Sequence, residues 1–277
     1  MRVEVARYAG VCYGVERALK LAAEAAELGG SVHTLGPLIH NPQAVEALRV
    51  QGVETASSVA DVESGAVIIR SHGVDPAIIG EARAKGLDVI DATCPHVSKA
   101  HEAAEELKRG GYAVVIVGEA DHPEVEGIMA HAGGTALVVE SAAELPEKLP
   151  SRRVGVVVQT TQSEARLAEV VDALLPKVRE LHVHNTICAA TAKRQESAAE
   201  LAESVDVVVV VGGHNSGNTT RLVEICRDAN PDTHHVETAN DLDRAWFLGA
   251  DSVGVTAGAS TPDEQMQGVI QAIEAME

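Results

Sequence analysis

Short apolar runs alternate with longer amphipathic stretches along the whole chain. The apolar runs are rich in valine and isoleucine, and they lie at 66–70, 113–118, 154–159 and 207–213. Stretches rich in alanine, glutamate and leucine follow at 97–109, 163–175 and 190–204. A strand that is apolar throughout is buried on both faces, which is typical of a parallel sheet covered by helices. The pattern predicts an α/β fold of mostly parallel sheets flanked by helices.

The order of these segments repeats along the chain. In each repeat a strand that ends in a polar loop comes first, then a short strand with a helical turn, then a third and a fourth strand. The segments with the helical turn resemble one another and lie at 53–62, 138–149 and 235–246. The fourth strand ends in cysteine, in DVIDATC at 88–94 and in LHVHNTIC at 181–188. The last repeat ends before its fourth strand, and RVEVARYAGVC at 2–12 has the matching pattern.

This repeat predicts three similar small domains. Their residues are 13–95, 96–189 and 190–277, and the N-terminal strand in 1–12 completes the third domain. Chain termini often lie close together, which makes this completion plausible. We expect the three domains to have a pseudo-three-fold arrangement around a central cluster.

Each predicted repeat contributes one cysteine. Ligands bind beyond the carboxyl ends of parallel strands, so Cys12, Cys94 and Cys188 would meet at one point. Three thiolates suit zinc with an open fourth position, or an iron–sulfur cluster in which one iron has no protein ligand. The residues alone leave both choices open. Cys226 lies outside this pattern, in a helical stretch, and we expect it to be a buried thiol.

Polar side chains gather between strand ends and helix starts. Hydroxyl and amide groups there can bind phosphate oxygens, although serine, threonine and asparagine are also ordinary helix caps. Histidines add positive charge when protonated, and capping does not require them. The sequence therefore predicts a pocket for a small anion. Its candidate residues are His40, Asn41, Ser71, His72, His122, Glu124, Thr160, Thr161, Asn215, Ser216, Asn218, Ser260 and Thr261.

The charge balance limits the partners. The formal net charge is −19, which disfavours general binding of nucleic acids and of anionic membranes. The chain contains no run of 18 apolar residues, so no membrane span is predicted. The first residues also lack the apolar stretch of a signal peptide. We therefore expect a cytoplasmic protein, and in that reducing compartment the four widely spaced cysteines are not expected to form disulfides.

Several longer motifs carry a family resemblance. They are GVCYGVERA at 10–18, GPLIHN at 36–41, RSHGV at 70–74, DATCPHVSKAH at 91–101, HPEVEG at 122–127, QTTQ at 159–162, NTICAATAKRQ at 185–195, GGHNSGNTTRL at 212–222 and TAGASTP at 256–262. In these motifs and in their order, the chain resembles the LytB-type 4-hydroxy-3-methylbut-2-enyl diphosphate reductases. These enzymes catalyse the last step of the methylerythritol phosphate route to isoprenoids.

The resemblance implies a 4Fe–4S cluster on Cys12, Cys94 and Cys188, with one iron open to the substrate hydroxyl. Two electrons and protons then remove this hydroxyl as water and give isopentenyl and dimethylallyl diphosphate. Glu124, rather than Glu126, is expected to donate the proton. By motif position, the residues that bind the diphosphate are His40, His72, His122, Ser216, Asn218 and Ser260.

The resemblance also assigns Thr160 to the orientation of the substrate hydroxyl and to proton relay. Gly217 stands where many relatives have a serine, so it can contribute only its backbone N–H. The run GGHNSGN at 212–218 does not match the G-x-G-x-x-G fingerprint of nicotinamide enzymes. A ferredoxin or flavodoxin type of electron donor is therefore expected.

Two other functions remain open at this stage. A zinc-dependent hydrolase would use the same three thiolates, with Glu124 as general base. A sensor would register oxidation of a cluster without turnover. Metal analysis distinguishes the hydrolase, and reductive turnover of the allylic diphosphate distinguishes the sensor.

Overall fold

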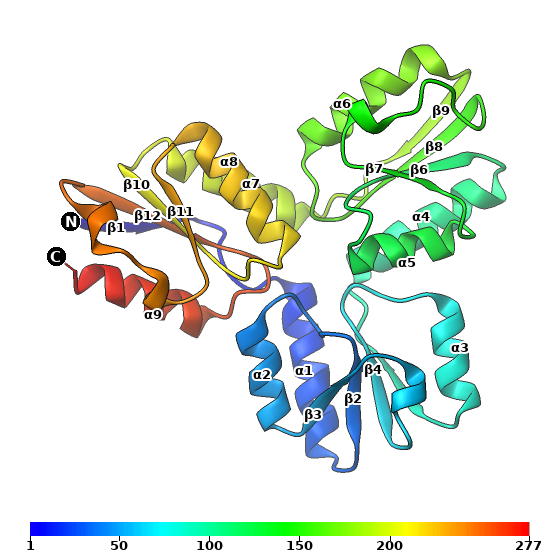
Figure 1. Cartoon of the computed structure of the whole chain (residues 1–277), viewed down its shortest axis with the longest axis horizontal. Coiled ribbons are helices and arrows are strands. Elements are labelled where there is room, and N and C mark those ends of the chain that lie inside the picture. The colour runs from blue at the N-terminus through cyan, green and yellow to red at the C-terminus, as the bar shows by residue number, and fades with distance from the viewer. Residues whose placement is uncertain (277) are drawn as a thin grey trace. The chain divides into compact units, whose positions relative to one another are not determined.

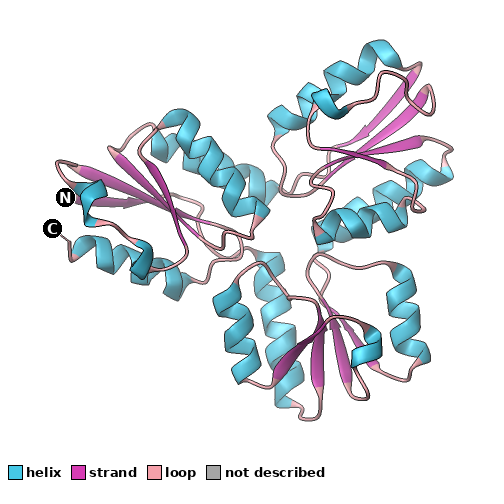
Figure 2. Ribbon diagram, in the orientation of Figure 1, coloured by secondary structure: helices cyan, strands magenta, loops and turns pink. Residues whose placement is uncertain are grey.

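The computed structural model describes residues 1–276, whose strands form three four-stranded sheets (Figures 1 and 2). The strand orders are β3-β2-β4-β5, β7-β6-β8-β9 and β11-β10-β12-β1. All hydrogen-bonded neighbours in these sheets run parallel. Helices flank each sheet. The predicted fold class, α/β with three small parallel sheets flanked by helices, is confirmed.

The elements follow the predicted alternation of strands and helices. The first sheet and its helices comprise α1 (Tyr13–Glu27), β2 (Val32–Leu35), α2 (Pro42–Val50), β3 (Val53–Ala56), β4 (Ala66–Ile69), α3 (Pro76–Ala84) and β5 (Asp88–Asp91). The second comprise α4 (Pro95–Arg109), β6 (Ala113–Val117), α5 (Pro123–His131), β7 (Leu137–Val139), β8 (Arg153–Val158), α6 (Glu164–Leu174) and β9 (Glu180–His184). The third comprise β1 (Arg2–Val5), α7 (Ala189–Ala202), β10 (Val207–Val211), α8 (Gly217–Ala229), β11 (Thr233–Val236), β12 (Ser252–Ala257) and α9 (Asp263–Glu274).

The N-terminal strand lies at the edge of the third sheet. β1 pairs with β12 in parallel register, with Arg2 opposite Ser252 and Val5 opposite Val255. The hydrogen bond from the Ala6 N–H to the Val255 carbonyl extends this pairing beyond the strand. In all three sheets the fourth strand thus lies beside the third. The residue borders of the three domains stay predictions.

The described residues pack into two units. Unit 1 contains residues 1–15, 40–44 and those from 189 onward, and with them the third sheet. Unit 2 contains residues 16–39 and 45–188, and with them the other two sheets.

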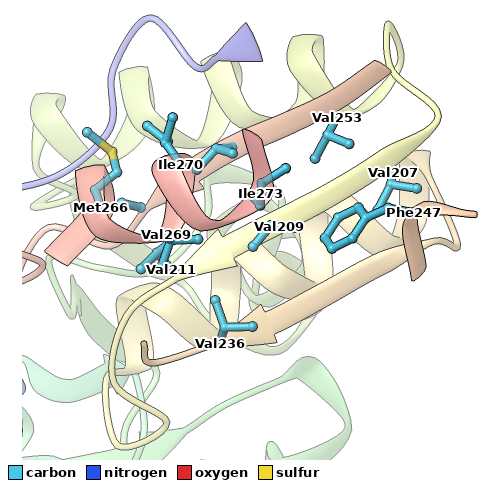
Figure 3. Close-up of a cluster of buried hydrophobic side chains, with 12 residues drawn as sticks. Val207, Val209, Val211, Val236, Phe247, Val253, Met266, Val269, Ile270 and Ile273 are labelled. Carbon is cyan, nitrogen blue, oxygen red and sulfur yellow. The ribbon is translucent and has the colours of Figure 1, made fainter. Parts of the chain in front are cut away.

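β10, one of the two inner strands of the third sheet, is buried on both faces. Val209 and Val211 pack with Val269 of α9 in one apolar cluster (Figure 3). Val208 and Val210 lie in a second cluster, with residues of α7 and α8. Successive side chains of a strand point to opposite faces, so an unbroken valine run needs a helix layer on each side. The apolar run at 207–213 predicted this arrangement.

Two glycine substitutions test the packing of these layers. A Cβ added at Gly155 in β8 would lie 2.5 Å from Cδ2 of Leu107, a buried side chain of α4. We expect Gly155→Ala to lower the free energy of unfolding by about 1–3 kcal/mol through overpacking. Gly268 in α9 has nothing within 4 Å of an added Cβ. Gly268→Ala should raise stability by about 0.5–1 kcal/mol.

Urea denaturation of the metal-free protein measures both changes. Equal stabilities of the two variants would contradict the packing assigned to Leu107.

Candidate functional site

Three cysteines occupy the same place in their respective sheets. Each follows the fourth strand of its sheet and directly precedes a helix: Cys12 before α1, Cys94 before α4 and Cys188 before α7. All three lie outside disulfides and are partly exposed. A helix N-terminus presents unpaired N–H groups and stabilises negative charge, so the position suits a thiolate.

The backbone of each cysteine makes the same hydrogen bond. Its N–H donates to the carbonyl oxygen of the residue that lies two positions beyond the third strand of the same sheet. The bonds are Cys12 to Ala259 at 3.0 Å, Cys94 to Ser71 at 2.9 Å and Cys188 to Thr160 at 3.0 Å. The equivalence inferred from the repeat therefore extends to the backbone of the cysteine loops.

The fourth cysteine differs from these three in its position within a helix and in its burial. Cys226 lies on α8, is fully buried in the apolar cluster of α7 and α8, and its Sγ is 3.7 Å from the Ala198 carbonyl oxygen. Burial raises the pKa of this thiol to about 12. Cys226 is therefore a packing residue, as the sequence predicted.

The metal centre itself stays a prediction. Within residues 1–276, no group of three or more His, Cys, Asp or Glu residues is arranged so that it could hold a metal ion. Cys12 belongs to unit 1, whereas Cys94 and Cys188 belong to unit 2.

Glu124 and Thr160 form a buried pair in unit 2. Glu124 is the second residue of α5 and is only 2% exposed. Its Oε1 accepts the backbone N–H of Thr160 at 2.6 Å, and its Oε2 accepts the Thr160 hydroxyl at 2.8 Å. Burial raises the pKa of Glu124 to about 7, although both hydrogen bonds from Thr160 act in the opposite direction. The carboxyl group can therefore hold a proton near neutral pH.

His122 begins the helix that carries Glu124. Its Nδ1 accepts the Glu124 N–H at 3.1 Å, and Pro123 occupies the first helical position, where no N–H is needed. Because Nδ1 accepts, the neutral ring carries its hydrogen on Nε2. The ring of His72 contacts His122 edge-on, with the centroids 5.6 Å apart. Unit 2 therefore brings His72 and His122 together, and it places Glu124 in the first turn of the helix that His122 caps.

Gln159 directly precedes Thr160 and fixes the backbone there, a role that the sequence did not predict. It is fully buried, and its Oε1 accepts the backbone N–H of Glu119 at 2.9 Å. A Cβ at Gly118 would lie 2.7 Å from the same oxygen, so this close approach needs glycine. The contact joins the ends of β6 and β8 just before Thr160. The QTTQ motif contains Gln159, but nothing in the motif reveals its partner.

Unit 1 holds the other predicted anion-binding residues. Ser216 caps α8, because its Oγ accepts the Thr219 N–H at 3.3 Å, and Gly217 is the first residue of that helix. The hydroxyl of Ser260 donates to the carbonyl oxygen of His40 at 3.1 Å. This bond brings the loop of His40 to the end of β12.

Asn218 has a side chain without a hydrogen-bonding role in the fold. It is 6% exposed, and among the described residues neither of its amide atoms has a hydrogen-bond partner. A buried amide without partners is costly, and a bound polar ligand would remove this cost.

Asn41 shows the opposite behaviour. Its Oδ1 accepts the Ala44 N–H at 2.8 Å, and its Nδ2 donates to Gln265 Oε1 at 2.9 Å. These bonds give Asn41 a structural role as the cap of α2.

Among the helices of residues 1–276, none combines the length and the apolar composition that a membrane span requires. The cytoplasmic location stays a prediction.

Comparisons with known proteins match nearly the whole chain. A family model described as LytB protein matches residues 3–274. A protein of Geotalea uraniireducens named 4-hydroxy-3-methylbut-2-enyl diphosphate reductase is 50% identical over 274 residues, 99% of this chain and 97% of that protein. A protein of Pelobacter propionicus with the same name is 52% identical over 263 residues, 95% of this chain and 94% of that protein.

Two solved structures are also similar. One is described as (E)-4-hydroxy-3-methyl-but-2-enyl diphosphate reductase, the terminal enzyme of the non-mevalonate pathway. It is 47% identical, with a TM-score of 0.73, and the match covers 99% of this chain and 100% of that one. The other is a diphosphate reductase from Plasmodium falciparum, which is 28% identical. It has a TM-score of 0.90 over 98% of this chain and 87% of that one.

The buried carboxyl of Glu124 predicts a pH-dependent stability. A carboxyl whose pKa rises from 4.5 to about 7 on folding favours the folded state less as the pH rises through this range. When the pH lies above both pKa values, the buried charge lowers the free energy of unfolding by about 3 kcal/mol. Glu124→Gln lacks this titration, so the metal-free variant should gain stability relative to the unsubstituted protein between pH 4.5 and pH 7.

Denaturant unfolding at several pH values measures the gain. Glu126→Gln, which removes an exposed carboxyl on the same helix, is the control. A stability difference for Glu124→Gln that does not change with pH would contradict the raised pKa.

Proposed function

The chain belongs to the LytB protein family, and from this we propose that it is a 4-hydroxy-3-methylbut-2-enyl diphosphate reductase. The observation that carries the proposal is a relative of that name, which is 50% identical to this chain over 99% of its length. The reaction removes the substrate hydroxyl as water, consumes two electrons and two protons, and yields isopentenyl and dimethylallyl diphosphate.

Cys12, Cys94 and Cys188 are the proposed ligands of a 4Fe–4S cluster. The donor set fits this group, because the three thiols lie outside disulfides, are partly exposed and are held by the same backbone hydrogen bond. Cys226, buried among apolar side chains, is not a ligand. Three protein thiolates leave one iron of such a cluster open. When bound, the cluster supplies single electrons and a Lewis acid for the substrate hydroxyl.

The proposed diphosphate site uses side chains at strand ends and helix starts. They are His40, His72, His122, Ser216, Asn218 and Ser260, together with the N–H of Gly217. Helix N-termini favour phosphate oxygens, and the neutral ring of His122 carries its N–H donor on Nε2. The amide of Asn218, which has no partner among the described residues, supports a ligand at this end of α8. Local donors of this kind attract an anion despite the acidic composition.

Glu124 is the proposed proton donor. Its raised pKa keeps a proton available near neutral pH, as a general acid requires. The Thr160 hydroxyl, 2.8 Å from Oε2, can accept this proton and pass on its own toward the substrate oxygen. The same hydroxyl can orient the substrate before the proton moves. Electrons come from a ferredoxin or flavodoxin type of donor.

Cysteine variants test the cofactor. After anaerobic reconstitution, Cys12→Ser, Cys94→Ser and Cys188→Ser should each lose most bound iron and sulfide, because serine is a poor ligand for iron in a cluster. Cys226→Ser is the matched control and should keep the iron and sulfide content of the unsubstituted protein. Iron and sulfide analysis of the purified proteins measures the effect.

A colourless Cys226→Ser protein would show that the fourth thiol had been misassigned. Zinc without sulfide in the unsubstituted protein would favour a hydrolase instead.

Two glutamate variants test the acid. Glu124→Gln should keep the cluster and substrate binding but lose turnover by a factor of about 10²–10⁴, the usual contribution of a general acid. Glu126→Gln should stay within a few-fold of the unsubstituted protein, because its carboxylate is exposed and binds Arg70 at 3.3 Å. Steady-state reduction of the allylic diphosphate with a chemical electron donor measures both. The opposite ranking of the two variants would reject Glu124 as the acid.

A further inference from the structure

Arg194 joins the loop of Cys12 to α7 within unit 1. The arginine is only 5% exposed, and its Nη2 donates to the carbonyl oxygen of Gly10 at 2.8 Å. Its Nη1 donates to the carbonyl oxygen of Ala190, in the first turn of α7, at 2.9 Å. Gly10 lies two residues before Cys12, so a buried cation binds the backbone of this cysteine loop.

Arg17 makes a similar contact in the first sheet, within unit 2. It lies on α1, and its Nη1 donates to the carbonyl oxygen of Thr93 at 3.1 Å. Its Nη2 donates to the carbonyl oxygen of Asp91, also at 3.1 Å. Asp91 ends β5 and Thr93 directly precedes Cys94, so the two bonds hold the short segment that leads to this cysteine.

The two arginines have similar places in the repeat, five residues after Cys12 for Arg17 and six residues after Cys188 for Arg194. Each lies in the second turn of a helix that begins directly after a cysteine, α1 after Cys12 and α7 after Cys188. Each donates to the loop that carries the cysteine at the end of the fourth strand of its own sheet. Two separate sheets thus use a similar contact from an arginine to the backbone before the cysteine, which neither the proposed acid nor the proposed diphosphate site explains.

The second sheet secures its loop differently. Lys99, five residues after Cys94, has the place on α4 that Arg17 has on α1, and it is exposed. Thr186, just before Cys188, bonds to β8 instead: its Oγ1 accepts the Val158 N–H at 3.0 Å and its hydroxyl donates to the Val158 carbonyl oxygen. Each of the three cysteine loops is therefore joined to a neighbouring helix or strand by a side-chain to backbone hydrogen bond.

We propose that Arg17 and Arg194 are positioning residues that hold the loops of Cys94 and Cys12 in the conformation that binds the cluster. The inference rests on the proposed function, because the cluster is part of it. A guanidinium stays protonated and offers five N–H donors, so one side chain can bind two carbonyl groups at once. A loop that is ordered before binding loses less conformational freedom when its thiolate becomes a ligand.

Gly10 makes the Cys12 loop sensitive to this support. Its φ is +77°, and its N–H donates to the Ala257 carbonyl oxygen at 3.2 Å while its own carbonyl accepts from Arg194. Glycine adopts this conformation readily but loses much freedom on ordering. The contact with Arg194 offsets part of that loss.

The experiment compares Arg17→Met, Arg194→Met and the two lysine variants with Arg49→Met. Arg49 is the matched control, because it is exposed on α2 and pairs only with Glu46 among the described residues. After anaerobic reconstitution, three quantities are measured: iron and sulfide per chain, the rate of iron release to a ferrous chelator, and the electron paramagnetic resonance spectrum of the reduced cluster. Thermal unfolding of the metal-free proteins shows whether each variant folds.

We expect both methionine variants to release iron at least about tenfold faster than Arg49→Met, because each loses two hydrogen bonds from a charged group and the loss of one has about a tenfold effect. Their reduced spectra should broaden, since the cysteine loops take more than one conformation. Lysine should partly restore the release rate, because it can reach one carbonyl but not two. If a methionine variant does not fold, the iron release rate and the reduced spectrum of the lysine variant at that position test the proposal.

Release rates and spectra equal to those of Arg49→Met would overturn the proposal while the unsubstituted protein still holds its cluster. An unsubstituted protein that binds no iron and sulfide would instead overturn the proposed function, so the two failures are distinguishable.

Discussion

A single backbone hydrogen bond, present once in each sheet, determines where the chemistry of this protein can lie. The cysteine N–H donates to the carbonyl oxygen two residues beyond the third strand, at Ala259, Ser71 or Thr160. The bond extends the parallel ladder past the strands, and so it places each thiol at the carboxyl end of its sheet. That end is also where helices begin, and their N-termini favour thiolates and phosphate oxygens alike.

The same constraint links the proposed acid to one of the cysteines. The N–H and hydroxyl of Thr160 donate to Glu124, while its carbonyl oxygen accepts the N–H of Cys188. One residue therefore connects the carboxyl group to a thiol loop. Gln159 supports the pair from the preceding position, through its bond to the Glu119 N–H. The buried carboxyl costs folding free energy, and such a cost is common where a side chain must hold a proton near neutral pH.

Much of the fold could be predicted from the sequence, because unbroken valine runs such as 207–213 require helices on both faces of a parallel sheet. The repeat also indicated that residues 2–12 match a fourth strand, and β1 pairs with β12. The supporting residues could not be predicted. Arg194 and Arg17 bind backbone carbonyls that lie 184 and 76 residues away in sequence, and a carbonyl partner leaves no pattern in the residue types. Helix capping by Asn41 was one of the alternatives that the sequence offered, whereas its hydrogen bond to Gln265, 224 residues away, could not be predicted.

The central claim is that Cys12, Cys94 and Cys188 together bind one iron–sulfur cluster with a coordination position open to substrate. An anaerobic count of iron and acid-labile sulfide, with absorption spectra before and after addition of the allylic diphosphate, tests it most directly. The account predicts iron and sulfide in equal amounts, and a spectrum that changes when the diphosphate binds. Bound zinc, or iron without sulfide, would contradict it, as would a cluster spectrum that substrate leaves unchanged.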